Sequence, residues 1–529
     1  MTKSLLKTTS AMALAATMAL PAFAQGTVNL ISADGTVDIV GEFVEFTENS
    51  YVIKTALGEL RLSAERVRCE GAACPTFDTG IGSGDSVVLA GSDALGLGVM
   101  PLLMEGFAGH LDAEVTSTST GENGQLLAKL VGDGGFGDDI GSYFVNSSNT
   151  DAAFEALLAG EAEIGMAARR IKPDEARALR AAGAGNMVDP ANEHIVAIDS
   201  IVVIVNPENG VSRLTTQQVG DIYAGRITNW SQVGGKDLPI TVVGRQEDSG
   251  TSAIFYRTVL GESSGGWNFA DDIEVAENNT EAAAMVNANP GAIGFVGYAF
   301  QRGAKPLSLV NACGITETPD AFSARTEEYA LQRRLYLYNT DASLSDSASQ
   351  FMDYALSSDA DPVIRKAGFI DLGVASRTQT IDSDRAQMLL DPTADAYEGG
   401  VMRDMLDTMV NYDRLSTTFR FRTGSSKLDE RGRVDMERLA QYLETAPTGT
   451  EIKFVGFTDS VGAFDSNREL AEQRASQVLA EMRAKVGDRL DGITMTTAAY
   501  GEVAPSACNA TDRGRSINRR VEVWITAAG

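Results

Sequence analysis

The chain is short of the residues that most metal centres and many catalytic sites require. Its 529 residues include two histidines, His110 and His194, and four cysteines. These residues form no Cys/His cluster at the spacing of a zinc site, and two histidines supply little general acid–base chemistry. The shortage argues against a zinc enzyme, and we expect neither a metal ion nor a cofactor.

Positive charge and long apolar runs are also scarce. Asp and Glu number 72 against 44 Lys and Arg, which gives a formal net charge of −28. A chain this acidic is repelled by nucleic acid and by anionic membrane surfaces. Beyond residue 24, no run reaches the roughly 18 consecutive apolar residues that a membrane helix needs. We therefore expect no nucleic-acid partner and no transmembrane segment in the mature chain, and any anion site must be local.

The first residues follow the pattern of a secretory signal. Lys3 and Lys7 precede an apolar run, and residues 21–24 (PAFA) place small side chains for cleavage before Gln25. Residues 1–24 are therefore predicted to be a signal peptide of an exported protein.

Residues 25–75 have the alternation of a small β module. Apolar and polar residues alternate in short runs, and Gly and Asn/Asp turns separate these runs. Cys69 and Cys74 are close enough in sequence to form a small disulfide loop in an oxidising compartment. We predict that disulfide, whereas the pairing of Cys313 and Cys508 stays open.

Three apolar runs in the middle of the chain each end in a corner rich in Gly, Ser, Thr or Asn. The runs are 87–89, 143–145 and 240–243, and the corners lie near residues 92, 147 and 249. A strand-to-helix corner leaves backbone N–H groups unpaired at the positive end of a helix dipole, where anions bind. Alternating β and α segments indicate α/β lobes with ligands at the carboxyl ends of the strands. The three corners are therefore predicted to converge on one anion.

The third corner, 244–252 (GRQEDSGTS), carries most of the chemistry. Arg245 offers a planar guanidinium that can grip an oxyanion bidentately, and Ser249 and Thr251 offer hydroxyl donors. The alternative is an N-capped helix beside a solvated arginine. The stretch 132–139 (GDGGFGDD) matches GxGxxG formally, but its aspartates oppose a pyrophosphate, so we interpret it as an acidic surface loop.

Residues 85–375 resemble the periplasmic phosphate-binding proteins of ABC importers. The resemblance rests on segments that stand in family order: Gly91-Ser92, Asn146-Ser147-Ser148, LTTQQVGDIYAGRITNW (214–230), VVGRQEDSGTS (242–252) and PGAIGFVGY (290–298). It implies a type 2 periplasmic binding protein, whose two lobes close over phosphate by a domain movement. The phosphate-binding residues that it implies are Ser92, Asp93, Ser147, Arg245, Ser249, Gly250 and Thr251, with Glu247 orienting the arginine.

Two positions depart from the family pattern. Family members carry an aspartate that accepts the proton of HPO4 and thereby rejects sulfate, whereas the matching run 165–170 (GMAARR) has Ala168 there. Asp93 stands where the family usually has Thr or Ser, so its carboxylate either takes over as proton acceptor or caps the following helix. Arg169 and Arg170 either line the cleft or form a solvated pair. The ligand is predicted to be phosphate or a similar oxyanion.

Residues 376–414 are acidic and have apolar residues at helical spacing, which predicts a helical linker. Residues 415–529 then resemble an OmpA-like peptidoglycan-binding domain. GFTDSVG, NRELAEQRA, YGE and GRSINRRVEV all stand in family order there. The membrane barrel of the name-giving protein is absent from the resemblance.

The OmpA-like resemblance implies that Asp459 and Arg474 hold the ammonium and carboxylate groups of diaminopimelate in the cell-wall peptide. Asn467 and Leu470 lie on the same motif and are expected to position that groove. The alternative is a salt bridge between Asp459 and Arg474 that ties the loop to the helix. The consecutive arginines 519 and 520 are expected to brace the sheet.

Together these patterns predict a multidomain α/β fold. It comprises a small N-terminal β module (25–75), a two-lobed type 2 periplasmic binding protein (85–375), a helical linker (376–414) and an α+β OmpA-like domain (415–529). The predicted function is noncatalytic: binding of phosphate or a related oxyanion in the periplasm of a Gram-negative bacterium. The molecule would be attached to peptidoglycan, with an ABC importer permease as a further partner and the inner face of the outer membrane as its place.

Two other function classes stay open. The first is a wall-anchored structural or signalling protein whose lobes bind another ligand or none. The second is a phosphoester-processing enzyme with Ser249 or Ser147 as nucleophile, although neither serine sits in a nucleophile elbow or has an obvious base.

Overall fold

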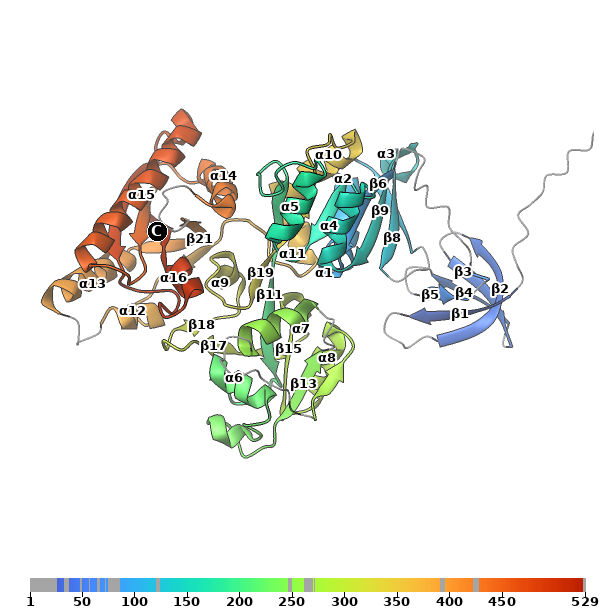
Figure 1. Ribbon diagram of the computed structural model, residues 1–529, viewed down its shortest axis with the longest axis horizontal. Coiled ribbons are helices and arrows are strands. Elements are labelled where there is room, and N and C mark those ends of the chain that lie inside the picture. The colour runs from blue at the N-terminus through green and yellow to red at the C-terminus, as the bar shows by residue number, and fades with distance from the viewer. Residues whose placement is uncertain are drawn as a thin grey trace, which may run out of the picture.

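The protein is described by a computed structural model that covers the following residues: 26–32, 38–47, 50–56, 58–63, 67–71, 73–74, 86–119, 124–245, 250–260, 270, 272–390, 395–421 and 428–526. The predicted signal peptide lies outside these residues. Within them, the strands form four sheets, and the predicted multidomain α/β fold is confirmed (Figure 1). No helix in these ranges is both long enough and apolar enough to cross a membrane.

The N-terminal module is a five-stranded antiparallel sheet in the order β4-β3-β2-β1-β5. Its strands are β1 (Thr27–Ser32), β2 (Asp38–Thr47), β3 (Ser50–Thr55), β4 (Gly58–Ser63) and β5 (Val67–Glu70). The alternation seen in the sequence places Leu30, Phe43 and Tyr51 in its core. Cys69 and Cys74 form a disulfide, with their Cα atoms 5.8 Å apart.

The two lobes share one sheet, in the order β14-β13-β15-β11-β19-β10-β6-β9-β8-β7. The first-lobe strands are β6 (Ser86–Ser92), β7 (Glu114–Ser119), β8 (Gln125–Val131), β9 (Asp139–Ser148), β10 (Ile164–Ala167) and β19 (Gln332–Tyr338). The second-lobe strands are β13 (Thr241–Arg245), β14 (Glu274–Ala276) and β15 (Ala292–Gly297). The glycine-rich stretch 132–139 forms the short turn α3 (Gly132–Gly135) and the loop that leads into β9, and its aspartates are exposed, which confirms its interpretation as an acidic surface loop.

One long strand, β11 (Glu193–Val205), passes from the first lobe to the second. Its first half pairs with β19, and its second half, from Ile201, pairs with β15. The chain returns near Leu331, whose carbonyl accepts a hydrogen bond from the Ile201 N–H. Each lobe has its own apolar core, so the two crossings at 200–201 and 331–332 form a hinge between two packed bodies.

Helices cover both lobes. The first lobe carries α1 (Asp93–Gly96), α2 (Met100–His110), α4 (Thr150–Ala159), α5 (Pro173–Ala181), α10 (Asp346–Leu356) and α11 (Asp361–Lys366). The second carries α6 (Thr216–Tyr223), α7 (Gly250–Phe255) and α8 (Asn279–Ala288), with a small sheet of β12 (Arg213–Thr215), β17 (Ser308–Val310) and β18 (Thr316–Glu317). The short helix α9 (Ala321–Arg325) packs against the apolar core of the first lobe through Ala324. In both lobes apolar helix faces pack against the buried strands.

The C-terminal domain is a five-stranded sheet with helices packed against it. The strand order is β20 (Ser376–Thr378), β21 (Tyr412–Arg420), β24 (Arg520–Thr526), β22 (Glu451–Phe457) and β23 (Thr494–Gly501). The helices are α12 (Asp384–Met388), α13 (Ala396–Met409), α14 (Glu430–Glu444), α15 (Phe464–Val486) and α16 (Asp512–Asn518).

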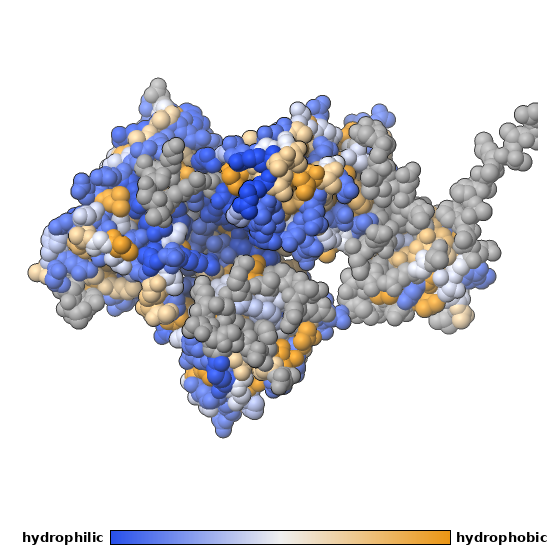
Figure 2. All heavy atoms as spheres, in the orientation of Figure 1, coloured by the Kyte–Doolittle hydropathy of each residue, from blue (hydrophilic) through white to orange (hydrophobic). Residues whose placement is uncertain are grey.

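The C-terminal domain is docked against the lobes. A disulfide joins Cys313, in the β17–β18 hairpin of the second lobe, to Cys508, in the loop before α16. Ion pairs add to this covalent link: Arg414 with Glu328, Arg420 with Glu327, and Arg438 with Asp361 of the first lobe. Figure 2 shows strongly hydrophilic residues gathered where this domain meets the lobes. The domain therefore contacts both lobes and the hinge.

Candidate functional site

Two of the three predicted anion-binding corners lie side by side. β6 and β9 are parallel neighbours whose register pairs Gly91 with Ser147 and Ser92 with Ser148, so both strands end at the same edge of the sheet. α1 begins directly after β6. After β9, the Asn149 side chain accepts a hydrogen bond from the N–H of Ala152 and caps α4.

The third corner faces the first two from the second lobe. β13 ends at Arg245 and α7 begins at Gly250, whereas residues 246–249, and with them Ser249 and Glu247, lie outside the described residues. Ile254 of α7 and Thr258 of the π-helical turn that follows line the same cleft as Ser92 and Asp93. α7 thus forms part of the opposite wall.

The cleft between the lobes has a volume of about 710 Å³. The first lobe contributes Ser92, Asp93, 148–150 and 168–170, and the hinge contributes residues from Glu327 to Tyr336. The cleft also contains Arg513, from the C-terminal domain. The structure therefore brings two corners and the helix of the third corner to one cavity.

Ser147 lies behind the cleft wall. Its side chain is buried, and among the described residues its hydroxyl has no hydrogen-bond partner. The Oγ atom lies so close to Gly96 that a Cβ built there would be 1.9 Å from it, so any larger residue at that position would force Ser147 to move. Ser148, which points to the other side of the strand, lines the cleft. The family pattern indicated the right corner, but the neighbouring residue is the one exposed in the cleft.

Arg245 is held by backbone and amide oxygens. Its Nη1 donates to Asn279 Oδ1 at 2.7 Å, and its Nη2 donates to the Glu277 carbonyl at 3.3 Å. Asn279 also accepts a hydrogen bond from the N–H of Gly297. Sequence reasoning missed Asn279, because it is 34 residues from Arg245. Next to Gly250, the side chain of Thr251 is buried.

Asp93 and Ala168 lie in the same cleft lining. The Asp93 side chain is exposed, and its Oδ1 accepts a hydrogen bond from the N–H of Ala94 at 2.7 Å. The N–H of Ala168 donates to the Thr150 hydroxyl at 3.0 Å. A carboxylate is therefore present in the cleft, although the position that the family uses for one holds alanine.

Five arginines line the cleft, against two carboxylates, Asp93 and Glu327. Four of these arginines have acidic partners: Arg169 with Glu175, Arg170 with Glu193, Arg333 with Asp199, and Arg334 with Glu327. The fifth is Arg513. Arg169 and Arg170 are thus ion-paired in the cleft lining. No local pattern in the sequence marked the last three arginines as cleft residues.

The buried carboxylate of Glu327 stays ionised in this setting. Burial alone would raise its pKa, but Arg334 and Arg420 outweigh burial and lower the pKa to about 2. The negative charge of Glu327 therefore offsets the positive charge of Arg334 on the hinge side of the cleft. Its ion pair with Arg420 links the hinge to the C-terminal domain.

A second candidate site lies at the loop after β22. Arg474 of α15 is 4% exposed, and its Nε and Nη1 atoms have no hydrogen-bond partner among the described residues. Its guanidinium lies 5.4 Å from the centre of the Phe421 ring. Burial and then the charge of Arg519 lower the pKa of Arg474. A buried cation in this state is suited to an anionic ligand.

Asp459 pairs with Arg519 instead of Arg474. Its Oδ2 accepts a hydrogen bond from Arg519 Nη1 at 2.7 Å, so Arg519 ties the loop after β22 to the start of β24, and Arg520 is buried and paired with Glu522 within the sheet. The remaining groove residues differ in exposure. Asn467 is buried and donates to the Asp459 carbonyl, and Leu470 is 39% exposed.

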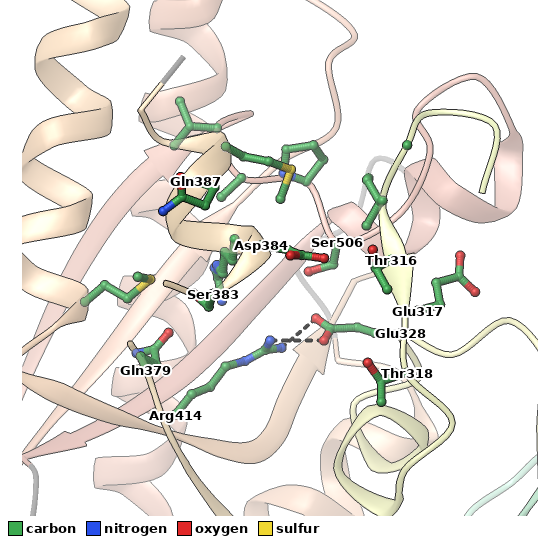
Figure 3. Close-up of a pocket in the computed structure, with 18 of the residues that line it drawn as sticks. Thr316, Glu317, Thr318, Glu328, Gln379, Ser383, Asp384, Gln387, Arg414 and Ser506 are labelled. Atoms are coloured by element: carbon green, nitrogen blue, oxygen red, sulfur yellow. Dashed lines mark hydrogen bonds and ion pairs between the residues drawn. The ribbon is translucent and has the colours of Figure 1, made fainter. Parts of the chain in front are cut away.

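Another cavity, of about 930 Å³, lies between the second lobe and the C-terminal domain, including α12 and α13. None of the predicted site residues lines it. Figure 3 shows Arg414 and Glu328 paired at its side, with Asp384 and Ser506 near its centre. In the part of the chain that the structure describes, no group of three or more His, Cys, Asp or Glu residues is placed to hold a metal ion.

Two family models match the chain. The model described as "PBP superfamily domain" matches residues 83–359, and the model of the OmpA family matches residues 420–519. The first match covers more than half of the chain, and the second covers most of the C-terminal domain.

Several known proteins are similar to the lobes. The phosphate-binding protein PstS of Bacillus subtilis is 30% identical over 184 residues, which are 34% of this chain and 57% of that protein. Protein SphX of Synechococcus elongatus is 27% identical over 277 residues, which are 50% of this chain and 79% of that protein. An ABC-type phosphate transport receptor from Vibrio cholerae, whose crystal structure is known, is 24% identical, with a TM-score of 0.40 over 54% of this chain and 99% of that chain. The chain thus spans just over half the length of the Bacillus relative.

Proposed function

Because the chain belongs to the PBP superfamily through residues 83–359, we propose that the cleft between its lobes binds phosphate or a closely similar oxyanion. The relatives named phosphate-binding protein support this ligand. The proposed ligand-binding residues are Ser92, Asp93, Ser147, Arg245, Ser249, Gly250 and Thr251, and we add Ser148.

The observation that carries the proposal is the convergence in one cleft. The ends of β6 and β9 face α7 across a cavity whose lining includes five arginines, in a protein with a net charge of −28. An acidic protein repels a dianion at long range, so binding requires a local concentration of N–H donors and cations. This cleft supplies both.

Selectivity would depend on Asp93. We propose that its exposed carboxylate accepts the proton of HPO4 in place of the acidic residue that Ala168 replaces. Sulfate carries no proton at neutral pH and would be repelled by the same carboxylate. The alternative role is a helix cap, because Asp93 already accepts a hydrogen bond from Ala94.

We further propose that the C-terminal domain binds peptidoglycan. The match to the OmpA family and the buried guanidinium of Arg474 support this role. Arg474 would receive the carboxylate of diaminopimelate, and Asp459 would receive its ammonium group, with Asn467 and Leu470 shaping the groove. A zwitterion needs one cation and one anion at the same groove, and Arg474 and Asp459 are near enough to interact electrostatically.

The resulting proposal is a noncatalytic, exported protein that captures phosphate while attached to the cell wall in the periplasm. In the transport version of this proposal, the protein lies at the inner face of the outer membrane and delivers its ligand to an ABC importer permease. A phosphoester-processing enzyme is the weaker alternative. Turnover of a chromogenic phosphate ester that is lost in Ser249→Ala would favour that enzyme.

Thermal unfolding tests the phosphate site. Phosphate should raise the melting temperature of the full-length mature chain, because a ligand that binds only the folded state stabilises it. Arg245→Ala should abolish this shift, whereas Arg226→Ala, a change at an arginine of the second lobe that pairs with Asp221, should keep it. An unchanged shift in Arg245→Ala would place the site elsewhere.

A further inference from the structure

Arg513 is the one residue of the C-terminal domain among the described residues that line the cleft between the lobes. It lies in the first turn of α16, and its side chain is exposed. Its Nη2 donates a hydrogen bond to the carbonyl of Ala330 at 2.6 Å. A guanidinium has five N–H donors, so this bond leaves donors for a second acceptor.

A hydrogen bond and a nearby disulfide hold Arg513 at the hinge. Ala330, its hydrogen-bond partner, precedes Leu331, where the chain returns from the second lobe to the first. The disulfide between Cys313 and Cys508 fixes the preceding loop to the second lobe. The side chain is thus positioned by contacts between domains and does not depend on a flexible tether.

The charge balance of the cleft distinguishes Arg513 from the other four arginines. Arg169, Arg170, Arg333 and Arg334 each pair with a carboxylate that offsets their charge. Within the described ranges, Arg513 forms no ion pair with a carboxylate. It is therefore the cleft cation whose charge is least compensated and most available to an anion.

We propose that Arg513 is part of the oxyanion site, so that the C-terminal domain completes the ligand-binding cleft of the two lobes. The ligand class is a small inorganic oxyanion, and the inference rests on the function proposed above. Arg513 holds the anion by a charge-assisted hydrogen bond while its Ala330 bond keeps it at the hinge. The wall-binding domain and the solute-binding lobes then share one binding site.

Isothermal titration of inorganic phosphate into the full-length mature protein tests this inference. A charge-assisted hydrogen bond contributes enough for its loss to weaken binding about tenfold or more. Arg513→Ala should show this loss, and Arg513→Lys, which keeps the charge without the planar fork, should show a smaller one. The matched control is Arg515→Ala, since Arg515 lies on the same helix, pairs with Asp512 and is absent from the cleft lining. Its affinity should stay within about twofold of the wild type.

The outcomes separate the inference from the proposed function. If the wild type binds phosphate and Arg513→Ala binds it equally tightly, Arg513 is not part of the site and only the inference fails. An equal loss in Arg513→Ala and Arg515→Ala would attribute the effect to a disturbed α16, which also overturns the inference. If the wild type binds no phosphate or related oxyanion, the proposed function fails and the inference fails with it.

Discussion

Within the C-terminal domain, the surroundings of Arg474 give the strongest indication of a ligand site. It is buried with two nitrogens unpaired in the described part of the chain, and an unpaired buried charge costs several kcal/mol. A carboxylate from outside the protein would remove this cost and add a charge-assisted hydrogen bond. This state is consistent with a ligand site and unfavourable for a residue of purely structural role.

Removing either charge should weaken wall binding. We expect Arg474→Ala and Asp459→Ala each to reduce co-sedimentation with purified peptidoglycan by about tenfold or more, because each loses a charge-assisted contact. Arg483→Ala is the control, since Arg483 is exposed on the same helix. Phosphate binding should be unchanged in all three variants. If Arg474→Ala co-sedimented with peptidoglycan as completely as the wild type, the groove would not bind the wall through this residue.

Asp93→Asn tests how the cleft distinguishes phosphate from sulfate. An amide cannot accept the HPO4 proton as well as a carboxylate does, and it does not repel sulfate. We expect phosphate affinity to fall about tenfold and the preference for phosphate over sulfate to shrink, as measured by titration with both anions. Asparagine caps helices as well as aspartate does. If the preference for phosphate over sulfate were unchanged in Asp93→Asn, Asp93 would serve only as a helix cap.

The sequence predicted where a binding corner lies when a motif marks it, but it did not predict which side chains of that corner face the cleft. The corner near residue 147 was located correctly, but the alternation of side chains along β9 buries Ser147 and exposes Ser148 to the cleft. Arg519 lies at the end of α16, just before β24, and its side chain reaches Asp459, whereas Arg520, the first residue of β24, pairs with Glu522 within the sheet.

At the scale of secondary-structure elements, the segment after α9 links the hinge to the C-terminal domain. Glu327 pairs with Arg334 of β19 and with Arg420 of β21, and Arg431 of α14 lies near enough to lower its pKa as well. Burial would raise the pKa of Glu327, but these charges lower it from 4.5 to about 2. The contact therefore depends on Glu327 remaining ionised.

This pKa predicts a direction for the stability of the protein against acid. Between 4.5 and about 2 the unfolded chain binds a proton at Glu327 and the folded chain does not. Its stabilising contribution is therefore complete above pH 4.5 and is lost as the pH falls toward 2. Glu327→Gln should lower stability at neutral pH by about 3–5 kcal/mol, because it leaves buried arginines without their partner.

Urea unfolding at several pH values measures this effect. Glu327→Gln should flatten the acid limb of the stability profile, whereas Glu161→Gln, a change at an exposed residue of the first lobe, should leave both the stability and the profile unchanged. A wild-type acid slope in Glu327→Gln would contradict the assignment of that slope to this carboxylate.

The elements themselves could mostly be predicted from sequence. The apolar runs before the corners are the strands β6, β9 and β13, since strands buried on both faces consist of continuous apolar residues. The hinge could not be predicted, because β11 appears in the sequence as one apolar strand and only its pairing shows that it serves both lobes.

At the scale of the whole molecule, the main finding is that the C-terminal domain is docked on the lobes. The sequence left the pairing of Cys313 and Cys508 open, and the interdomain ion pairs join residues far apart in the chain, such as Arg414 and Glu328. Such contacts leave no periodic pattern in the sequence. The domain order could therefore be predicted, whereas the contact between domains could not.

Removal of the interdomain disulfide should loosen this docking. Cys313 and Cys508 are 195 residues apart, and a disulfide that closes a long loop stabilises a protein by about 2–4 kcal/mol. The Cys313→Ser/Cys508→Ser variant should lose about that much in urea unfolding and become more sensitive to proteases near the hinge. Cys69→Ser/Cys74→Ser is the control, because it opens a loop within the N-terminal module. Equal stability of the lobes in both variants would contradict a role of the disulfide in docking.

Two lobes of a strongly acidic protein are proposed to form one site for a small oxyanion. This site can be tested by calorimetric titration of the mature protein with phosphate, sulfate, molybdate and arsenate. We expect saturable binding of phosphate at one site per chain, with weaker binding of sulfate. If none of these anions binds, the cleft is not an oxyanion site.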